Sequence, residues 1–267
     1  MEIFKRKIKK ILSKACPTRY RQGFLILNYH SINPNHKYST TPEDFDRQMK
    51  YLYENFQVIK LSEINNENKN LKIIITFDDG FFDNYEYAFP ILKKYNLPAT
   101  IFLVSDFIFN NIDITKNWIP YRGLRPLTQD SIREMSNSGL IDFGSHGKNH
   151  EPVSSLSKNI FKADLIESIN KIQECSGKKV DNYAFPFGQL SQRGLFNVDF
   201  FNEIGLLNVC TTDWGINKNN NLSKFLKRIR IDSYDSMDDF KEKINGSWNF
   251  VSFFQFIKNL KCYLKKY

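Results

Sequence analysis

Long apolar runs and paired cysteines are both missing from this 267-residue chain. No stretch of about 18 or more apolar residues occurs, which argues against a membrane-spanning helix. The four cysteines are scattered and form no Cys-x-x-Cys pair, so the sequence offers neither a zinc knuckle nor a disulfide framework and fits a reducing compartment. The basic first residues are followed by no unbroken apolar stretch and no small-residue cleavage site. We therefore expect a cytoplasmic protein without a secretory signal.

Acidic residues are scarce at the two ends of the chain but not in its middle. The formal net charge is +9. Residues 1–21 carry a net charge of +7 and residues 258–267 carry +4, which leaves the remainder at −2. A nucleic-acid-binding protein carries its positive charge on the folded face that docks. Because the basicity here belongs to the ends, we expect no nucleic-acid partner.

Both ends combine lysines with apolar residues at helical spacing. These apolar residues are Phe4, Ile8, Ile11 and Ala15 near one end, and Phe250, Phe253, Phe254, Ile257, Leu260 and Leu264 near the other. Two interpretations stay open for each segment: a terminal helix that packs on the domain with solvated lysines outside, or a helix that attaches to an anionic membrane surface. We divide the chain into a basic amphipathic segment (1–21), a central domain (22–245) and a basic amphipathic helix (246–267).

Apolar strands alternate with helical stretches through the central domain. Strands are predicted at 24–27, 71–77, 100–104, 140–144, 182–185 and 207–211, helices at 83–95 and 158–175, and loops at the Asn-rich stretches 65–70 and 217–221. This alternation indicates βα units and a mainly parallel sheet. A chain of this length fits a closed or nearly closed α/β barrel, in which functional side chains lie at the carboxyl edge of the strands.

The clearest motif is the pair of carboxylates Asp78 and Asp79, which follows the apolar strand at 71–77 and precedes Gly80. Two adjacent carboxylates at the end of a buried strand are costly unless something compensates their charge. A divalent cation bound by one carboxylate would do so and leave the other free as a base. The alternative is a strand-to-helix turn in which an aspartate caps the next helix.

Two of the four histidines, His146 and His150, lie four positions apart after the strand at 140–144. A His-x-x-x-His pair can present both imidazoles to one ion. Together with the two carboxylates, the pair predicts a metal site with oxygen and nitrogen ligands and room for water. Two unrelated loop histidines would explain either residue alone, but they explain the pair poorly.

Three weaker motifs follow later strands. Pro186 and Gly188 flank Phe187, whose backbone N–H in such a turn could stabilise an oxyanion. Most turns of this type, however, are only turns. The pair Asp213-Trp214 ends a strand, where core packing with a cap is the plainer explanation. The segment 226–231, which contains Arg228, also follows apolar residues.

In this order the motifs resemble the polysaccharide deacetylase family, also called the NodB-homology or chitin-deacetylase-like family. The resemblance covers roughly residues 24–231, and it is most specific in Thr-Phe-Asp-Asp-Gly at 76–80 and Ser-His-x-x-x-His at 145–150. The Tyr-His element at Tyr29 and His30 is similar to one near the start of many bacterial members. The resemblance implies a distorted (β/α) barrel with mainly parallel strands and a hydrolase that cleaves non-peptide carbon–nitrogen bonds.

The resemblance also implies a role for each matching residue. Asp78 is the catalytic base, and one divalent metal ion, commonly zinc, is bound by Asp79, His146 and His150. Oxyanion stabilisation and substrate binding are assigned to Pro186, Phe187, Asp213 and Trp214, and we add Arg228 to this pocket although it departs from the family pattern. In the family, the matching aspartate orients a catalytic histidine and the matching tryptophan lines the sugar pocket.

Two positions depart from the family pattern. Tyr183 stands where the family often has an arginine, three residues before the motif proline. Arg228 stands where a Leu-x-His element supplies the general acid, and an arginine does not release a proton in proteins. We therefore expect His30 to protonate the leaving amine or to bind a sugar hydroxyl, unless Asp78 returns the proton it took. A histidine that merely packs locally is the alternative. On this interpretation Asp213 and Arg228 form an ion pair that shapes the pocket.

The sequence thus predicts metal-dependent removal of an N-acetyl group from a sugar, in a glycan or glycan precursor of cell-surface glycan biosynthesis. The basic ends and the expected location favour a small or lipid-linked precursor, met at the inner membrane surface. Two alternatives remain. One is a hydrolase of another amide, such as a cyclic imide or ureide. The other is a catalytically silent glycan-binding relative that kept the pocket.

Overall fold

The computed structural model describes residues 20, 22–64, 70–116, 119–194, 196–218 and 225–264, with side chains as far as Asn259. The predicted basic segment 1–21 therefore lies outside the described residues except for Tyr20, and so do residues 65–69 and 219–224 of the two Asn-rich loops. None of the helices in the described part of the chain has both the length and the apolar character that crossing a bilayer requires.

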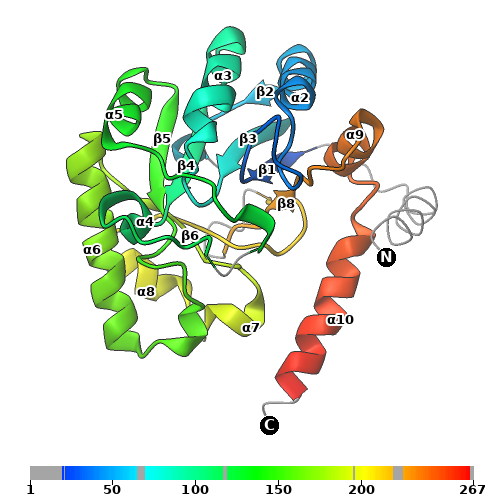
Figure 1. Cartoon of the computed structure of the whole chain (residues 1–267). Helices are drawn as coiled ribbons and strands as arrows, with labels where there is room; N and C mark the ends of the chain where they lie inside the picture. Colours follow the sequence, from blue (N-terminus) through cyan, green and yellow to red (C-terminus); the bar gives the residue numbers. More distant parts are fainter. Residues whose placement is uncertain are drawn as a thin grey trace.

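A parallel sheet forms the centre of the molecule (Figure 1). Its strands are β1 (Gly23–Tyr29), β2 (Gln57–Val58), β3 (Leu71–Phe77), β4 (Ala99–Leu103), β5 (Ile141–Ser145), β6 (Asn182–Ala184), β7 (Asn208–Cys210) and β8 (Ile229–Arg230). They lie in the order β7-β6-β5-β4-β3-β1-β8, and β2 pairs with β3. Each predicted strand is present, with bounds that differ by at most two residues.

The two edges of the sheet meet through the residues that lead into β8. Leu226 bridges to Cys210 of β7. Its N–H donates to the carbonyl of Val209 at 2.8 Å, and its carbonyl accepts from the N–H of Thr211 at 2.8 Å. The sheet is thereby curled into a nearly closed, distorted (β/α) barrel, which confirms the predicted fold class.

Helices cover the outside of the sheet (Figure 1). They are α2 (Pro42–Asn55), η1 (Leu61–Glu63), η2 (Asn84–Ala88), α3 (Phe89–Tyr95), α4 (Ser105–Phe109), η3 (Ile119–Tyr121), α5 (Gln129–Asn137), η4 (Val153–Ser155), α6 (Lys158–Ser176), α7 (Leu190–Arg193), α8 (Val198–Glu203), α9 (Met237–Asn245) and α10 (Phe250–Leu264). Because side chains fill the barrel and helices cover it, β1 and the end of β3 are buried on both faces, as their continuous apolar runs predict.

The two helices that the sequence predicts in the central domain are both present. The stretch at 83–95 begins with the π-helical turn η2 and continues as α3, which ends at Asn96 in the left-handed conformation (φ 53°). The stretch at 158–175 is α6, capped at its start by the hydroxyl of Ser157 and ended by Gly177 at φ 68°. Local capping residues therefore set the bounds of these helices.

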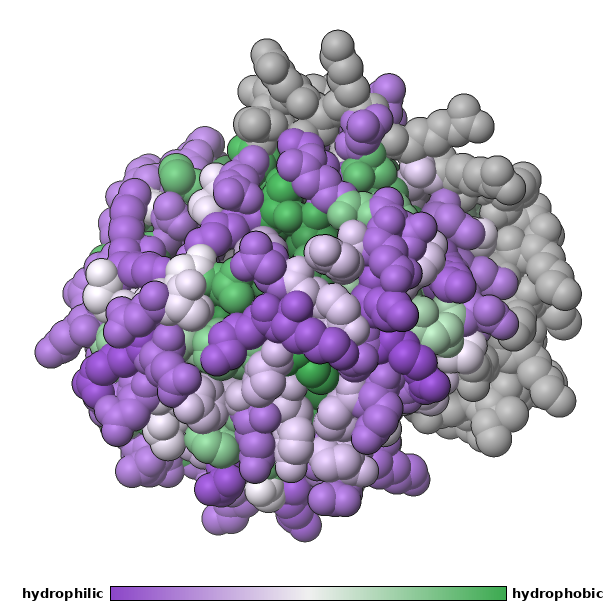
Figure 2. Space-filling model, turned by 90° about the horizontal axis from the view of Figure 1, so that it is seen from above, coloured by the Kyte–Doolittle hydropathy of each residue, from purple (hydrophilic) through white to green (hydrophobic). Residues whose placement is uncertain are grey.

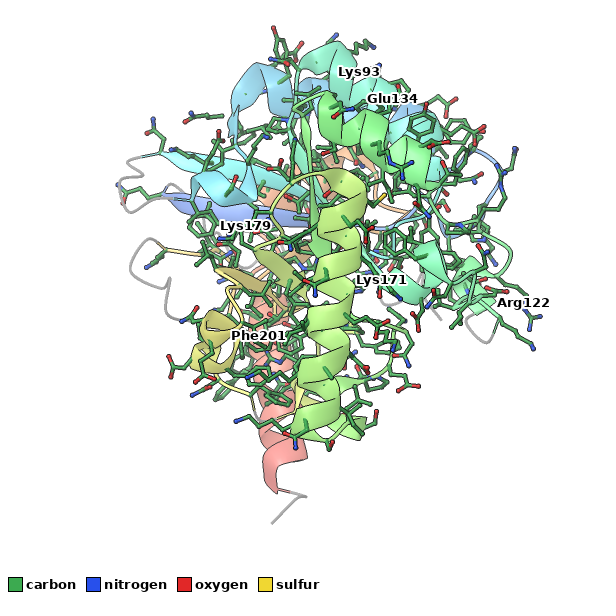
Figure 3. All side chains as sticks on the ribbon, turned by 90° about the vertical axis from the view of Figure 1, so that its left-hand side faces the viewer. Lys93, Arg122, Glu134, Lys171, Lys179 and Phe201 are labelled. Carbon is green, nitrogen blue, oxygen red and sulfur yellow. The ribbon has the colours of Figure 1, made fainter. Side chains whose placement is uncertain are left out.

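An aromatic cluster joins α6 and α8 to the sheet. Figure 3 shows α6 crossing the front of this side, with Phe201 of α8 beside it. Tyr183 of β6 is fully buried, and its ring stacks on that of Phe201 at a centroid distance of 5.5 Å. Burial raises the pKa of Tyr183 well above its usual range. The position where the family often has an arginine is thus part of the apolar core and supplies no charge to the strand ends.

The C-terminal helix α10 follows a sharp break in the chain. Gly246, at φ 92°, ends α9, and the predicted boundary at 245 coincides with that end. From there α10 extends beyond the barrel along the lower right of Figure 1. Tyr20 lies near its start, because the Tyr20 hydroxyl donates to Asn249 at 2.8 Å. Whether 22–245 folds as an independent domain stays a prediction.

Candidate active site

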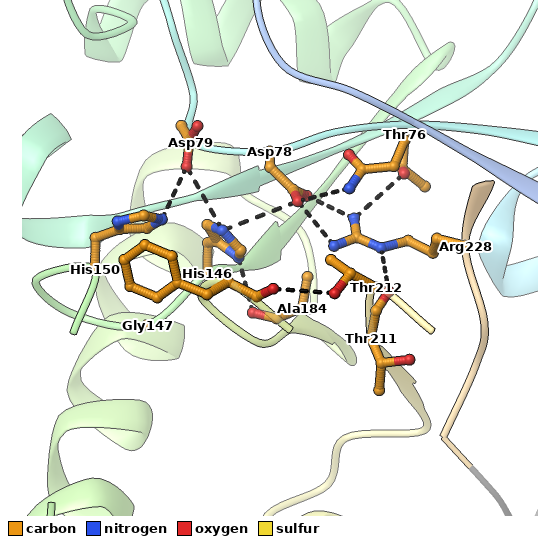
Figure 4. Close-up of polar contacts among 12 residues, drawn as sticks. Thr76, Asp78, Asp79, His146, Gly147, His150, Ala184, Thr211, Thr212 and Arg228 are labelled. Atoms are coloured by element: carbon orange, nitrogen blue, oxygen red, sulfur yellow. Dashed lines mark hydrogen bonds and ion pairs between the residues drawn. The ribbon is translucent and has the colours of Figure 1, made fainter. Parts of the chain in front are cut away.

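The residues of the predicted motifs gather at the carboxyl edge of the barrel (Figure 4). His30 follows β1, Asp78 and Asp79 follow β3, and His146 follows β5. The parallel register places neighbouring strand ends side by side: the last residue of β1 pairs with the last residue of β3, and the last residue of β4 with the last residue of β5. Residues that are more than 100 positions apart in sequence are thereby brought to one place.

Asp79, His146 and His150 form a compact group at this edge. The Nε2 atoms of His146 and His150 lie 3.5 and 3.3 Å from Oδ1 of Asp79. One ligand atom from each of the three residues lies within 4.8 Å of the others. Asp79 and His150 adopt φ values of 75° and 58°, a region that is costly for residues other than glycine. The surrounding structure holds this strained backbone where the three side chains converge.

The chemistry of this group fits a divalent cation. Both carboxylate oxygens of Asp79 are buried and have no hydrogen-bond partner among the described residues. Burial and the charge of Asp78 raise the pKa of Asp79 well above its usual range, an effect that a bound cation would reverse. An unsatisfied buried carboxylate of this kind is costly unless a cation compensates it.

The two histidines have the orientation and the protonation state that metal binding requires. Nδ1 of His146 lies 2.8 Å from the carbonyl oxygen of Ala184, which must accept the Nδ1 proton and so leaves Nε2 directed at Asp79. Burial lowers the pKa of His146, and it lowers that of His150 to about 3. Both imidazoles are therefore neutral near pH 7, which is the form that binds metals.

Asp78 is held in a different way, by a buried arginine. Nη1 and Nη2 of Arg228 donate to Oδ1 and Oδ2 of Asp78 at 2.6 and 2.8 Å, and Asn28 donates to Oδ2 at 3.1 Å. Nε of Arg228 donates to the carbonyl of Thr211 at 2.9 Å. Burial alone would raise the pKa of Asp78, but the charge and hydrogen bonds of Arg228 lower it below its usual range. Asp78 is therefore ionised at neutral pH.

The expected ion pair between Asp213 and Arg228 is wrong. Oδ2 of Asp213 lies 3.0 Å from Nη1 of Arg193, whereas Arg228 contacts Asp78. The physical reason is burial: the side chain of Arg228 is 0% exposed and needs an equally buried carboxylate, while that of Asp213 is 30% exposed at the rim. The sequence shows an arginine next to apolar residues, which needs an anion if it is buried, but it does not show which carboxylate lies beside it.

A cavity of about 500 Å³ opens above these residues. Its lining includes Asp78, both histidines of the group, and three of the predicted pocket residues, Phe187, Asp213 and Trp214. The ring of Phe187 lies 4.7 Å from that of His150, with the Phe187 backbone at φ 61°. Pro186 and Arg228 are buried and do not line this cavity.

His30 lies at the boundary between this cavity and an adjoining one of about 280 Å³. Its ring stacks on that of Tyr121 at a centroid distance of 5.6 Å, and its carbonyl accepts a hydrogen bond from Asn84 at 2.8 Å. The carboxylate of Asp83 holds the loop after His30 in place, because it accepts a hydrogen bond from the hydroxyl of Ser31 at 2.5 Å. Burial lowers the pKa of His30 to about 3, so its ring is neutral near pH 7.

Several residues that line the cavity were not predicted from the sequence. They are Asn28, Gln189, Thr212, Arg230, Asp232, Tyr234, Val251, Gln255, Lys258 and Asn259. Four of these belong to α10. An amphipathic pattern predicts that a helix has two faces, but it does not predict which surface each face contacts, so nothing in the sequence placed α10 at the site.

Comparisons with known proteins agree with this geometry. A family model described as polysaccharide deacetylase matches residues 65–199, half of the chain. The Bacillus subtilis (strain 168) protein YxkH, which carries a polysaccharide deacetylase name, is 27% identical over 177 residues, covering 64% of this chain and 58% of that protein. A poly-β-1,6-N-acetyl-D-glucosamine N-deacetylase of Staphylococcus epidermidis is 26% identical over 201 residues, covering 64% and 67%. The chain thus spans about two thirds or less of the length of these relatives.

Two solved structures share the barrel. The Streptococcus pyogenes deacetylase PplD, solved with acetate, superposes with a TM-score of 0.70 and 23% identity, over 84% of this chain and 99% of that one. IcaB from Ammonifex degensii gives a TM-score of 0.69 and 22% identity, over 86% and 98%. At this identity the likeness concerns the fold, while the family model covers the carboxylate pair and both histidines of the site. The chain belongs to the polysaccharide deacetylase family.

Proposed function

We propose that this protein hydrolyses the N-acetyl group of a sugar unit in a glycan, with one divalent cation bound by Asp79, His146 and His150. The observation that carries the proposal is the presence of two adjacent carboxylates that are held differently, one of which, Asp78, lines the cavity. Asp79 is buried without a hydrogen-bond partner and faces the two imidazoles, whereas Asp78 is ionised and held by Arg228. The names of the staphylococcal relatives support an N-acetylglucosamine polymer as the substrate class.

The set of one carboxylate and two imidazoles suits zinc, which we propose as the ion. When bound, it would supply Lewis acidity toward the acetyl carbonyl and toward water. Oδ2 of Asp78 lies 4.0 Å from Nε2 of His146. We therefore place the base next to the three metal ligands but do not count it as a ligand. Its ionised carboxylate accepts a proton from the attacking water, and Arg228 keeps it in place during that transfer.

The bond changes then follow from the positions of the remaining residues. A carbon–oxygen bond forms to the acetyl carbon, and the backbone N–H of Phe187 donates to the developing oxyanion. The carbon–nitrogen bond breaks when the amine nitrogen receives a proton. We assign this proton to Asp78, which returns the one it took, because the ring of His30 is neutral near pH 7. His30 lines the same cavity, and we assign it to binding a sugar hydroxyl. Acetate and the free amino sugar leave, and Trp214 and Asp213 contact the sugar ring.

Acetate release tests the proposal. The purified full chain, loaded with zinc, is incubated with N-acetylglucosamine oligomers of increasing length, and released acetate and free amines are measured. We expect both products in equal amounts, and none from the Asp78→Asn variant. Binding of the oligomers without release of acetate would favour the silent glycan-binding relative. Turnover of a cyclic imide or ureide in place of the acetamide would favour the other amide hydrolase.

The cellular setting of the reaction remains a prediction. We expect a cytoplasmic protein that acts on a small or lipid-linked precursor of a cell-surface glycan. Fractionation of cells that express the full chain, with acetate-release activity followed in each fraction, tests this location.

A further inference from the structure

Helix α10 carries an unusual group of exposed aromatic side chains. Phe253, Phe254 and Phe256 are 62%, 54% and 63% exposed. Single exposed apolar residues are normal on a protein surface, but three within four positions of one helix form a continuous apolar face. The side of the molecule shown in Figure 2, away from the free end of α10, is by contrast covered mainly by hydrophilic residues, with apolar residues in small patches between them.

The other side of α10 is attached to the rim of the active site. The Oε1 atom of Gln255 accepts from the backbone N–H of Trp214 at 2.7 Å, and its Nε2 donates to the carbonyl of Thr212 at 3.1 Å. Lys258 donates to Gln189 at 2.9 Å. At about 100° per residue, Gln255 lies nearly opposite Phe253 on the helix. The helix is therefore held by its polar side, and its phenylalanine face points away from the barrel.

The charge around this face has one sign. The last 25 residues of the chain contain no aspartate or glutamate, and residues 258–267 contain four lysines. The other basic end starts at the same place, because Tyr20 is held at the junction of α9 and α10. Its N–H donates to the carbonyl of Asn245 at 3.0 Å, and its hydroxyl donates to Asn249. Tyr20, which belongs to the segment 1–21 with its net charge of +7, therefore lies beside the start of α10.

We propose that the face formed by Phe253, Phe254 and Phe256 inserts into the headgroup region of an anionic membrane, with the lysines of both chain ends binding the lipid phosphates. Apolar rings flanked by cations are the composition that holds a helix in the plane of a membrane interface. A second copy of the chain is a poorer occupant, because pairing two such helices would bring like charges together.

This placement would bring the active site close to the lipid. Because α10 is only about 10 Å across, a cavity lined by one of its sides lies about one helix diameter from a surface bound by the other. Resting on the proposed deacetylation, the inference specifies a substrate glycan that is presented at the membrane, either lipid-linked or emerging from it. The enzyme would then act where the glycan is tethered rather than on free chains in solution.

Co-sedimentation with vesicles tests the inference. The full chain is mixed with vesicles of phosphatidylglycerol and phosphatidylcholine, or of phosphatidylcholine alone, and the variant Phe253→Gln/Phe254→Gln/Phe256→Gln is compared with wild type. Glutamine keeps the helix propensity while removing the rings. The matched control is Ile160→Gln/Ile166→Gln/Leu207→Gln, which removes three exposed apolar side chains (53%, 39% and 62% exposed) far from α10 in sequence.

We expect wild type and control to pellet with the anionic vesicles and the phenylalanine variant to bind at least about tenfold more weakly. Release of acetate from a water-soluble oligomer should be equal in all three proteins, so that loss of vesicle binding and loss of activity are separable. Wild type that stays in the supernatant would overturn the inference while leaving the deacetylase proposal intact. A wild-type dimer in light scattering that the variant converts to a monomer, without vesicle binding, would also overturn it.

Discussion

Arg228 binds Asp78 through both of its terminal nitrogens, at 2.6 and 2.8 Å, across 150 positions of the sequence. Both side chains are buried, so bulk solvent does little to stabilise either charge. A planar guanidinium satisfies both oxygens of one carboxylate at the same time. The pair therefore fixes the orientation of the proposed base and keeps it ionised.

Loss of the guanidinium should disable the site and weaken the fold. In Arg228→Met the carboxylate of Asp78 stays buried without a cation, and we expect the free energy of unfolding to fall by about 3–5 kcal/mol. Arg228→Lys should also lose activity, because a point charge cannot make the two parallel hydrogen bonds. Denaturant unfolding and acetate release measure the two effects.

The double variant Asp78→Asn/Arg228→Met separates the ion pair from general packing. Since the unpaired charge is then absent, we expect it to be more stable than Arg228→Met alone. A double variant as unstable as the sum of the two single variants would show that the two residues act independently.

Replacing each of the two adjacent aspartates by asparagine should affect the zinc content of the protein differently. Asp79→Asn removes a charged ligand, and we expect the zinc content measured by elemental analysis to fall strongly. Asp78→Asn should leave the metal content near the wild-type value and abolish acetate release, because only the base is lost. If Asp78→Asn loses its metal while circular dichroism shows a native fold, Asp78 is a ligand and the division of roles is wrong.

Substitution of His30 tests which residue gives the proton to the leaving amine. If His30 protonates the leaving amine, His30→Gln should lower kcat by about 10²–10⁴-fold without loss of metal. The stacked ring of Tyr121 offers a control, because Tyr121→Phe keeps the packing against position 30. Wild-type turnover in His30→Gln would remove this histidine from the reaction and leave Asp78 to act as both base and acid.

The buried carboxylate of Asp83, which accepts hydrogen bonds from the loop after His30, should make the stability of the fold depend on pH. Burial raises the pKa of Asp83 from 3.8 to about 6, so the folded protein binds this proton more tightly than the unfolded chain does. The resulting stabilisation is fully present below the unfolded pKa and is lost as the pH rises through 6. Relative to Asp83→Asn, the wild type should lose on the order of 2 kcal/mol between about pH 4.5 and about pH 7.5.

Urea unfolding at a series of pH values measures this difference. Asp130→Asn serves as the control, because the side chain of Asp130 is 94% exposed. A wild-type curve that stays parallel to that of Asp83→Asn across the whole range would contradict the raised pKa.

The barrel and the grouping of Asp79 with the two histidines were predictable because their signals are local. Continuous apolar runs predict buried strands, and the carboxyl ends of parallel strands bring Asp79 and His146 together, with His150 only four positions further along the loop. The partner of Asp78 was missed for the opposite reason. It depends on the closure of the barrel, which places β8 beside β1 and Arg228 directly before β8. No local pattern predicts which strands become neighbours. The same holds for α10, whose two faces were visible but whose position was not.

Barrel closure also has a consequence for how the protein is made. A ribosome delivers Asp78 long before Arg228, so a growing chain can pair β1, β3, β4 and β5 while the carboxylate still lacks its cation. Burying that charge early would be costly, and water must remain around it until the last strand arrives. We therefore expect the emerging protein to pass through a stage with an open, hydrated barrel, until the arrival of Arg228 and β8 closes the barrel and completes the site.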